Sequence, residues 1–296
     1  MASEFRAGYV AIVGKPNVGK STLLNVLINY RLSAISPKPQ TTRHKILGIL
    51  NGDNYQAVFI DTPGVLKPRY ELHRFMQKEI EEAVDTADLS VVVVEPFHEP
   101  QAEEVSIIEQ VKALPKILAI NKIDLIEKPL LLPLIDKYRA YNFLEIHPIS
   151  ALKGSGIDEL KSSIVKNLPT GEPFYPQNQI TEKPERFFVE ELIREGIFYR
   201  YGEEIPYSCA VEVEEFQERP EGQKDYIRAV IYVEKPSQRA ILLGKNGEAI
   251  KRLGKLAREN IEKLLGRPVY LELFVKVKPD WRDDKRFIKD TVYRYD

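Results

Sequence analysis

The feature that most constrains this chain is a motif of the form GxxxxGKS, Gly14-Lys15-Pro16-Asn17-Val18-Gly19-Lys20-Ser21. An apolar run at residues 9–13 precedes it, and residues 22–28 carry apolar side chains at helical spacing. A strand, a glycine turn and a helix form a phosphate-binding loop, because backbone N–H groups and the positive end of the helix dipole surround an anion there. An ordinary glycine-rich turn is the alternative. We expect residues 14–22, Thr22 included, to bind a nucleotide, with Lys20 at the β- and γ-phosphates and Ser21 on magnesium.

The composition is typical of a globular protein with two domains. The chain has 296 residues, of which 43% are hydrophobic and 29% are charged. Its formal net charge of -1 excludes strong overall attraction to nucleic acid, so RNA binding would require a local basic patch. The single cysteine, Cys209, excludes a disulfide framework, and the four histidines lack metal-ligand spacing. Since no secretory signal or membrane-spanning run is present, we expect a cytoplasmic protein.

From residue 9 to about residue 168, short apolar strands alternate with amphipathic helices. Further strands are predicted at residues 57–60, 89–94, 117–120 and 143–149, and helices at residues 74–85, 100–113 and 157–168. Runs rich in β-branched residues are typical of a parallel sheet that is covered on both faces. The pattern predicts a doubly wound α/β domain, whose ligands bind at the carboxyl ends of the strands.

Two further motifs follow directly after predicted strands. Asp61-Thr62-Pro63-Gly64 follows Ile60, where Asp61 can hold magnesium through a water and the Gly64 N–H can approach a γ-phosphate. A plain Pro-Gly turn is the alternative. Asn121-Lys122-Ile123-Asp124 follows Ile120. The Asp124 carboxylate can accept hydrogen bonds from N1–H and N2–H of guanine, a pair that adenine lacks, which argues against an ATPase or a kinase.

Other residues would complete a guanine site. Lys122 can lay its aliphatic stem over the base, and Asn121 can bind the base edge and brace the loop. Ser150-Ala151 follows the next strand and would offer a backbone N–H to guanine O6, and Leu152 is also expected at the nucleotide. These residues complete the expected nucleotide-binding set.

In this order, GKPNVGKS, DTPG, NKID and SA resemble the motifs of a Ras-like GTPase of the translation-factor-related class. The resemblance implies a mobile loop around Pro39-Gln40-Thr41-Thr42-Arg43. Thr42, ranked ahead of Thr41, would join Ser21 on magnesium only while the γ-phosphate is present. The implied magnesium set is Ser21, Thr42 and Asp61, and the implied catalytic set is Asn17, Lys20, Thr42, Asp61 and Gly64.

One position departs from the Ras-like pattern. Val65 stands where such enzymes have a glutamine that orients the attacking water, so we expect slow intrinsic hydrolysis. Asn17 resembles an asparagine that ligates potassium in several GTPases of this branch. A potassium ion can supply the positive charge that an arginine finger supplies elsewhere. The alternative is that Asn17 only stabilises the loop.

The pattern changes after a linker. Residues 171–179 lack periodicity and carry two prolines, so we divide the chain into a GTPase domain (1–172), a linker (173–183) and a second domain (184–296). The sequence pattern of the second domain predicts a helix at residues 184–201, strands at 208–216 and 226–234, a helix at 248–265 and a strand at 269–277.

A GxxG loop, Gly244-Lys245-Asn246-Gly247, precedes the long amphipathic helix. The element order resembles an α+β KH domain of the bacterial type (type II), whose GxxG loop clamps about four nucleotides. The basic side chains expected at RNA are Lys245 in the loop and Lys251, Arg252, Lys255 and Arg258 after it. A solvated helix face after a tight turn is the alternative. For Trp281, packing in the core is favoured over stacking on a base.

The combination resembles the Era GTPases of bacterial ribosome assembly, over nearly the whole chain. The resemblance implies a GTP-hydrolysing, magnesium-dependent switch that binds the 3′ end of small-subunit ribosomal RNA and acts in maturation of that subunit. It also implies loose association with the inner membrane, and we expect a monomer. Two alternatives stay open at this point: a nucleotide-regulated RNA-binding module without significant turnover, and an RNA-modifying enzyme that uses GTP.

Overall fold

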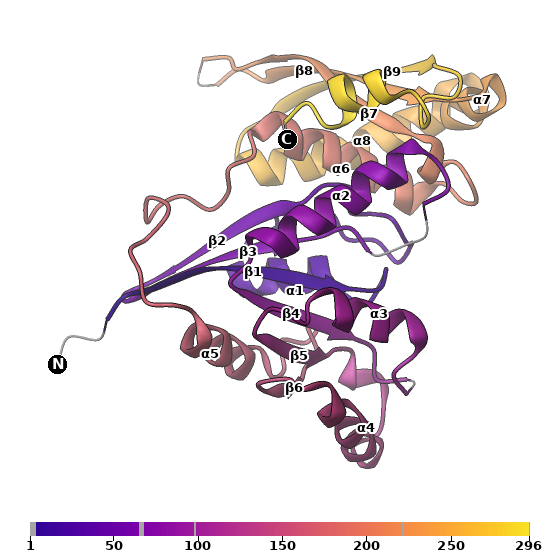
Figure 1. Ribbon diagram of the computed structural model, residues 1–296. Coiled ribbons are helices and arrows are strands. Elements are labelled where there is room, and N and C mark those ends of the chain that lie inside the picture. The colour runs from indigo at the N-terminus through magenta and orange to yellow at the C-terminus, as the bar shows by residue number, and fades with distance from the viewer. Residues whose placement is uncertain (1–3, 65–67, 98, 221, 296) are drawn as a thin grey trace. The chain divides into compact units, whose positions relative to one another are not determined.

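The computed structural model describes residues 4–64, 68–97, 99–220 and 222–295 (Figure 1). The chain divides into two compact units. The first unit comprises Met1–Lys67 and Phe75–Glu182, and the second comprises Pro68–Arg74 and Lys183–Asp296. Among the described residues, no helix is long and apolar enough to cross a membrane.

The first unit contains a six-stranded sheet with the order β2-β3-β1-β4-β5-β6. All neighbours pair in parallel except β2 and β3, which are antiparallel. The strands are β1 (Arg6–Gly14), β2 (Ile46–Gly52), β3 (Tyr55–Asp61), β4 (Leu89–Val94), β5 (Lys116–Ile120) and β6 (Ile146–Pro148). The prediction of a mostly parallel sheet in an α/β domain is confirmed.

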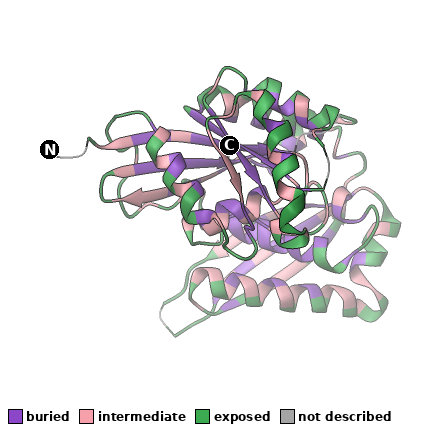
Figure 2. Ribbon diagram, turned by 90° about the horizontal axis from the view of Figure 1, so that it is seen from below, coloured by how far each residue is buried: buried purple, intermediate pink, exposed green. Residues whose placement is uncertain are grey.

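The helices of the sheet domain are α1 (Lys20–Ile28), α2 (Glu71–Thr86), α3 (Ala102–Gln110), α4 (Leu131–Tyr138) and α5 (Ile157–Asn167), although the first four residues of α2 belong to the second unit. Side chains from α3 and α4 share one apolar core with β1, β4 and β5. Figure 2 shows buried residues concentrated along the strands and on the inward faces of the helices. The carboxyl ends of β1, β3, β4 and β5 therefore meet at one edge of a rigid sheet.

Two elements of the first unit were not predicted, and two predictions were too long, since α3 covers only nine residues of the expected helix at 100–113. β2 was missed because its sequence contains Gly48, Asn51 and Gly52, which are poor strand formers. α4 was missed because it is short and contains Pro133, which a first helical turn tolerates. The strand expected at residues 143–149 is reduced to the three residues of β6.

The second unit is a three-stranded sheet with three helices packed against one face, while a short helix, α9 (Lys285–Phe287), places Phe287 against Tyr232. It contains α6 (Glu185–Arg200), β7 (Ala210–Gln217), β8 (Asp225–Val233), α7 (Pro236–Leu243), α8 (Glu248–Leu265) and β9 (Val269–Val277). β8 pairs antiparallel with β7 and parallel with β9. The element order is the one expected of a bacterial-type KH domain. Helix α6 can approach α8 closely because Gly196 has no side chain, and a Cβ there would lie 2.9 Å from Leu253 Cδ1.

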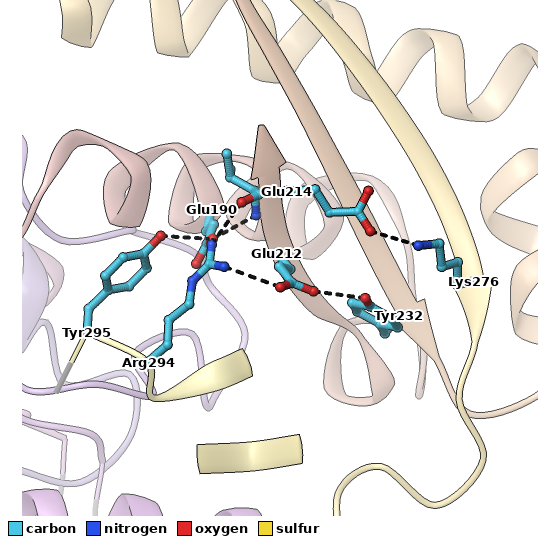
Figure 3. Close-up of polar contacts among 8 residues, drawn as sticks. Glu190, Glu212, Glu214, Tyr232, Lys276, Arg294 and Tyr295 are labelled. Atoms are coloured by element: carbon cyan, nitrogen blue, oxygen red, sulfur yellow. Dashed lines mark hydrogen bonds and ion pairs between the residues drawn. The ribbon is translucent and has the colours of Figure 1, made fainter. Parts of the chain in front are cut away.

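The carboxyl-terminal segment completes the core of the second unit. Trp281 is fully buried, and its Nε1 donates a hydrogen bond to Ser208 O at 2.8 Å. The prediction that Trp281 packs in the core is confirmed. Further along, the Arg294 guanidinium joins α6 to β7 by donating to the Glu190 carboxylate, to Val213 O at 3.1 Å and to Glu212 Oε1 at 3.3 Å (Figure 3).

The buried Glu190 carboxyl makes the stability of the second unit depend on pH. Burial raises the pKa of Glu190 from 4.5 to about 7, although the Arg294 charge acts in the opposite direction. Between these two values the folded state binds more protons than the unfolded state, so stability falls as pH rises through that range. We expect Glu190→Gln to make the free energy of unfolding depend less on pH in this range. Urea unfolding at pH 5 and pH 8 measures it, and equal pH dependence in both proteins would contradict the assignment.

Candidate functional site

The glycine-rich loop joins β1 to α1 and turns its lysine back onto the loop itself. Lys20 Nζ donates to Gly14 O and to Lys15 O, both at 2.9 Å. Burial lowers the pKa of Lys20 to about 8. Gly19 has a φ of 99°, and a Cβ there would lie 2.3 Å from Asn121 Nδ2, so only glycine fits. The loop therefore holds a buried ammonium group among backbone dipoles, where an anionic phosphate would stabilise its charge.

The three expected magnesium ligands meet at one point. Ser21 Oγ donates to Asp61 Oδ2 at 2.7 Å and lies 2.8 Å from Thr42 Oγ1. Asp61 is buried, its pKa is raised by that burial, and its Oδ1 has no hydrogen-bond partner within the part of the chain that the structure describes. Hydroxyl and carboxylate oxygens are the ligands that Mg²⁺ prefers, and a cation would keep Asp61 ionised. The residues present fit a magnesium ion.

The structure also distinguishes between the two candidate switch threonines, Thr41 and Thr42. The Thr41 hydroxyl donates to Lys38 O at 2.8 Å and lies at the same distance from Ser36 Oγ. Thr41 is thus engaged inside its own loop, while Thr42 faces Ser21. This geometry favours Thr42 as the switch threonine.

The segment that ends β3 packs against the phosphate loop. Thr62 Oγ1 donates to Ile12 O at 2.8 Å. Gly64 is buried against Pro16, because a Cβ on Gly64 would lie 2.7 Å from Pro16 Cα. No residue with a side chain fits between them, so Gly64 lies beside the phosphate loop as expected. Val65 lies outside the described residues.

The residues expected at the guanine base form one connected group. Asn121 Nδ2 donates to Val18 O at 2.8 Å, and the Ala151 N–H donates to Asn121 Oδ1 at 2.9 Å. Ser150 Oγ donates to Asp124 Oδ1 at 2.6 Å. Asn121 therefore braces the phosphate loop against the last loop of the site, while a hydroxyl orients Asp124.

Two details of this group were not anticipated. Lys122 Nζ donates to Asn17 O at 2.7 Å and pairs with Glu95, a residue that sequence reasoning missed. Its position directly after β4, at the carboxyl edge of the sheet, was the available signal. The Ser150 N–H donates to Ser155 O at 3.0 Å and the Ala151 N–H to Asn121 Oδ1 at 2.9 Å, and the contact of this segment with guanine O6 stays a prediction.

The GxxG loop of the second unit presents its backbone and its two central side chains to solvent. Gly244 and Gly247 have φ values of 68° and 76°, and Asn246 has a φ of 52°. Lys245 and Asn246 are exposed. A Cβ on Gly244 would lie 2.6 Å from Ala249 Cβ, so the loop can turn tightly into α8 only with glycine there.

A groove of about 450 Å³ lies between α8 and β9. Basic side chains on α8 line it at helical spacing, and Lys224 and Tyr270 add to it from the sheet side; the α8 members are Lys251, Lys255 and Arg258. Lys224 and Tyr270 were missed because they lie far from the GxxG loop in sequence. The structure does not place Arg252 among the groove residues; its guanidinium lies 3.7 Å from Glu248.

Known proteins share both halves of this chain. A family model described as "50S ribosome-binding GTPase" matches residues 9–122, and a KH domain model matches residues 204–282. "GTPase Era" of Geobacter metallireducens is 44% identical over 294 residues, which cover 98% of this chain and 99% of that protein. The chain belongs to the Era family of GTPases. It is therefore a GTPase with a carboxyl-terminal KH domain.

Other Era proteins extend the similarity. "GTPase ERA-like, chloroplastic" of Oryza sativa is 45% identical and covers 98% of this chain and 70% of that protein. A crystal structure of Era in complex with MgGDPNP and nucleotides 1506–1542 of 16S ribosomal RNA has a TM-score of 0.94 and 40% sequence identity. It covers 98% of this chain and 99% of that one. That Era holds both a magnesium nucleotide and an RNA strand.

Proposed function

We propose that this Era GTPase is a GTP-gated clamp for the 3′ end of small-subunit ribosomal RNA and acts in assembly of that subunit, in the cytoplasm. The observation that carries the proposal is the meeting of Ser21, Thr42 and Asp61 at one point. Thr42 belongs to a loop whose position would be stabilised further by a γ-phosphate and its magnesium. The nucleotide state would then decide whether this loop is ordered.

GTP hydrolysis is catalysed mainly by positioning the reactants and by stabilising the charge of the transition state, with little covalent chemistry by the protein. Bound magnesium would neutralise the charge that develops on the phosphates. Lys20 would bind the β- and γ-phosphates, the Gly64 N–H would approach the γ-phosphate, and Ser21 and Thr42 would hold the metal. Asp61 would orient this set from its buried position. Asp124 would select guanine, with Asn121 fixing the loops around the base.

The groove between α8 and β9 suits single-stranded RNA. Lys251, Lys255 and Arg258 would neutralise successive phosphates, and the GxxG loop would clamp the backbone. Tyr270 is 51% exposed, so a base can stack on its ring. These positive side chains supply the local patch that the net charge of -1 conceals. The complex formed by the Era relative supports ribosomal RNA as the strand.

The affinity for a single-stranded RNA from the 3′ end of small-subunit ribosomal RNA tests the clamp directly. We expect binding at least tenfold tighter with GDPNP than with GDP, equivalent to about 1.4 kcal/mol of coupling. By linkage, the RNA must then tighten GDPNP binding by the same factor. Equal RNA affinity in the two nucleotide states would contradict the gate. The family's membrane association and the monomeric state stay predictions.

Potassium is expected to accelerate hydrolysis through Asn17. Asn17 Nδ2 donates to Pro37 O at 3.0 Å, which leaves the carbonyl oxygen of the side chain available as a cation ligand. We expect GTP turnover to be about tenfold or more faster in KCl than in NaCl, with Asn17→Ala removing the difference. If Asn17 only stabilises the loop, the variant will lose activity equally in both salts.

Gly254 lies inside α8 and lines the RNA groove. Gly254→Ala should stabilise the second unit by about 0.5–1 kcal/mol, because alanine suits a helix interior better. The new Cβ would meet Leu273 Cδ1 at 3.6 Å, which is ordinary van der Waals contact. The same methyl group would occupy the groove, so RNA affinity should fall about fivefold or more. Urea unfolding and RNA titration measure the two effects, and unchanged RNA affinity would exclude contact at this position.

A further inference from the structure

A buried side chain of β3, Gln56, makes several of the hydrogen bonds that hold the linker on the first unit. Gln56 has no exposed surface. Its Oε1 accepts the N–H groups of Phe174 at 2.7 Å and Tyr175 at 3.0 Å, and its Nε2 donates to Tyr175 O at 2.8 Å and to Asn51 Oδ1 at 2.7 Å. One carboxamide thus satisfies three backbone groups of the linker. Removing it would leave them without partners, which costs free energy wherever water is excluded.

Further contacts hold the linker along β2. Asn51 Nδ2 donates to Gln177 O at 3.0 Å, and the Ile49 N–H donates to Ile180 O at 2.8 Å. The Phe174 ring lies 4.9 Å from the ring of Tyr9 on β1. β2 is an edge strand, paired only with β3 within the sheet, so the linker occupies its other side. The linker is therefore attached to the β2–β3 hairpin over several residues.

The same hairpin carries the switch segments at its opposite end. Its register runs from the pair Ile46 and Asp61 to the pair Gly52 and Tyr55. Thr42 precedes β2 by a few residues, and Asp61 ends β3 at the expected magnesium site. Gln56 and Asn51 lie at the far end, beside the turn. Because the β2–β3 ladder is continuous, a displacement of the hairpin at its nucleotide end would be carried to its linker end.

We propose that the β2–β3 hairpin transmits the nucleotide state to the linker, with Gln56 as the positioning residue that couples the two. The inference rests on the proposed function, since it supplies the route by which GTP would control RNA binding. The linker leads directly into α6 of the KH domain, which begins at Glu185. A purely structural clamp would hold the linker equally in both nucleotide states, and this difference makes the proposal testable.

The experiment compares the full-length wild type with Gln56→Leu, with the milder Asn51→Ala and with a matched control, Gln179→Ala. Gln179 is a linker residue whose side chain, among the residues that the structure describes, bonds only to the linker's own Thr181 O, at 3.2 Å. Two quantities are measured with GDPNP and with GDP: affinity for the ribosomal 3′ strand, and hydrogen exchange of the amides at residues 172–181. Affinity for GDPNP checks that the nucleotide site is intact.

We expect the GDPNP-to-GDP ratio of RNA affinities to fall from tenfold or more in the wild type to below twofold in Gln56→Leu. Asn51→Ala should give an intermediate ratio, and Gln179→Ala the wild-type ratio, with GDPNP affinity within about twofold throughout. If the Gln56→Leu protein does not fold, the ratio measured for Asn51→Ala tests the coupling by itself. A wild-type ratio retained in the Gln56 and Asn51 variants would overturn the coupling and leave the gated clamp standing.

The exchange data distinguish failure of the coupling from failure of the clamp. If RNA affinity is independent of nucleotide in the wild type, the proposed gate is wrong. The coupling is then supported only if two conditions hold. In the wild type, the protection of the amides at 172–181 from hydrogen exchange must differ between GDPNP and GDP. In the Gln56→Leu protein, the protection of the same amides must not differ. Protection that is the same in both states would overturn the coupling as well.

Discussion

Asp124→Asn should reverse the base preference of the nucleotide site, from guanosine to xanthosine triphosphate, by about a thousandfold in relative affinity. In the proposed site the Asp124 carboxylate would accept two hydrogen bonds from guanine, and Ser150 Oγ donates to Asp124 Oδ1 at 2.6 Å. In the variant this hydroxyl would hold the amide oxygen, which turns the amide nitrogen toward the base. That N–H₂ group would face the N1–H and N2–H donors of guanine with donors of its own, whereas it could donate a hydrogen bond to the C2 carbonyl of xanthine.

Competition between the two nucleotides for the magnesium-loaded protein measures the reversal. Asp158→Asn is the matched control, because Asp158 is exposed in the first turn of α5, outside the base-binding group. The control should keep the wild-type preference for GTP. An Asp124→Asn protein that still prefers GTP would show that the base is read elsewhere.

Much of the nucleotide site follows from the sequence because parallel strands impose a simple geometry. Gly14, Asp61 and Asn121 each stand at or directly after the end of a strand, and strand ends in one parallel sheet share an edge. Their meeting could therefore be predicted from spacing and apolar runs. The limits of α8 and β9 were equally readable, because each has a clear period and a glycine near its start or end.

Other features depend on contacts that no local pattern encodes. Gln56 is a polar residue in an apolar strand, and nothing in its neighbourhood reveals that its partners lie more than a hundred residues later. Lys224 and Tyr270 join the basic face of α8 only because β8 and β9 pair in parallel. β2 lacks the alternating apolar pattern, since it is stabilised by pairing with β3 and not by its own propensity.

Replacing Lys245 and Asn246 together by aspartate should weaken RNA binding at least a hundredfold. The change converts one positive and one neutral side chain into two negative ones, a net change of -3, at the two exposed positions of the GxxG loop. If RNA phosphates approach the loop backbone between Gly244 and Gly247, as in other KH domains, both new carboxylates would repel them at short range. The loop itself should survive, because aspartate tolerates left-handed backbone such as that of Asn246, whose φ is 52°.

A charge-matched control separates this local repulsion from a general loss of attraction. Asn260→Asp with Lys263→Asp makes the same change in charge near the other end of α8, outside the groove. If the GxxG loop clamps the strand, the control should lose no more than about threefold in affinity, and the steepness of its salt dependence should be unchanged. GTP hydrolysis without RNA should persist in both proteins. Equal losses in the two variants would mean that RNA responds only to overall charge, and the GxxG loop would then have no part in binding.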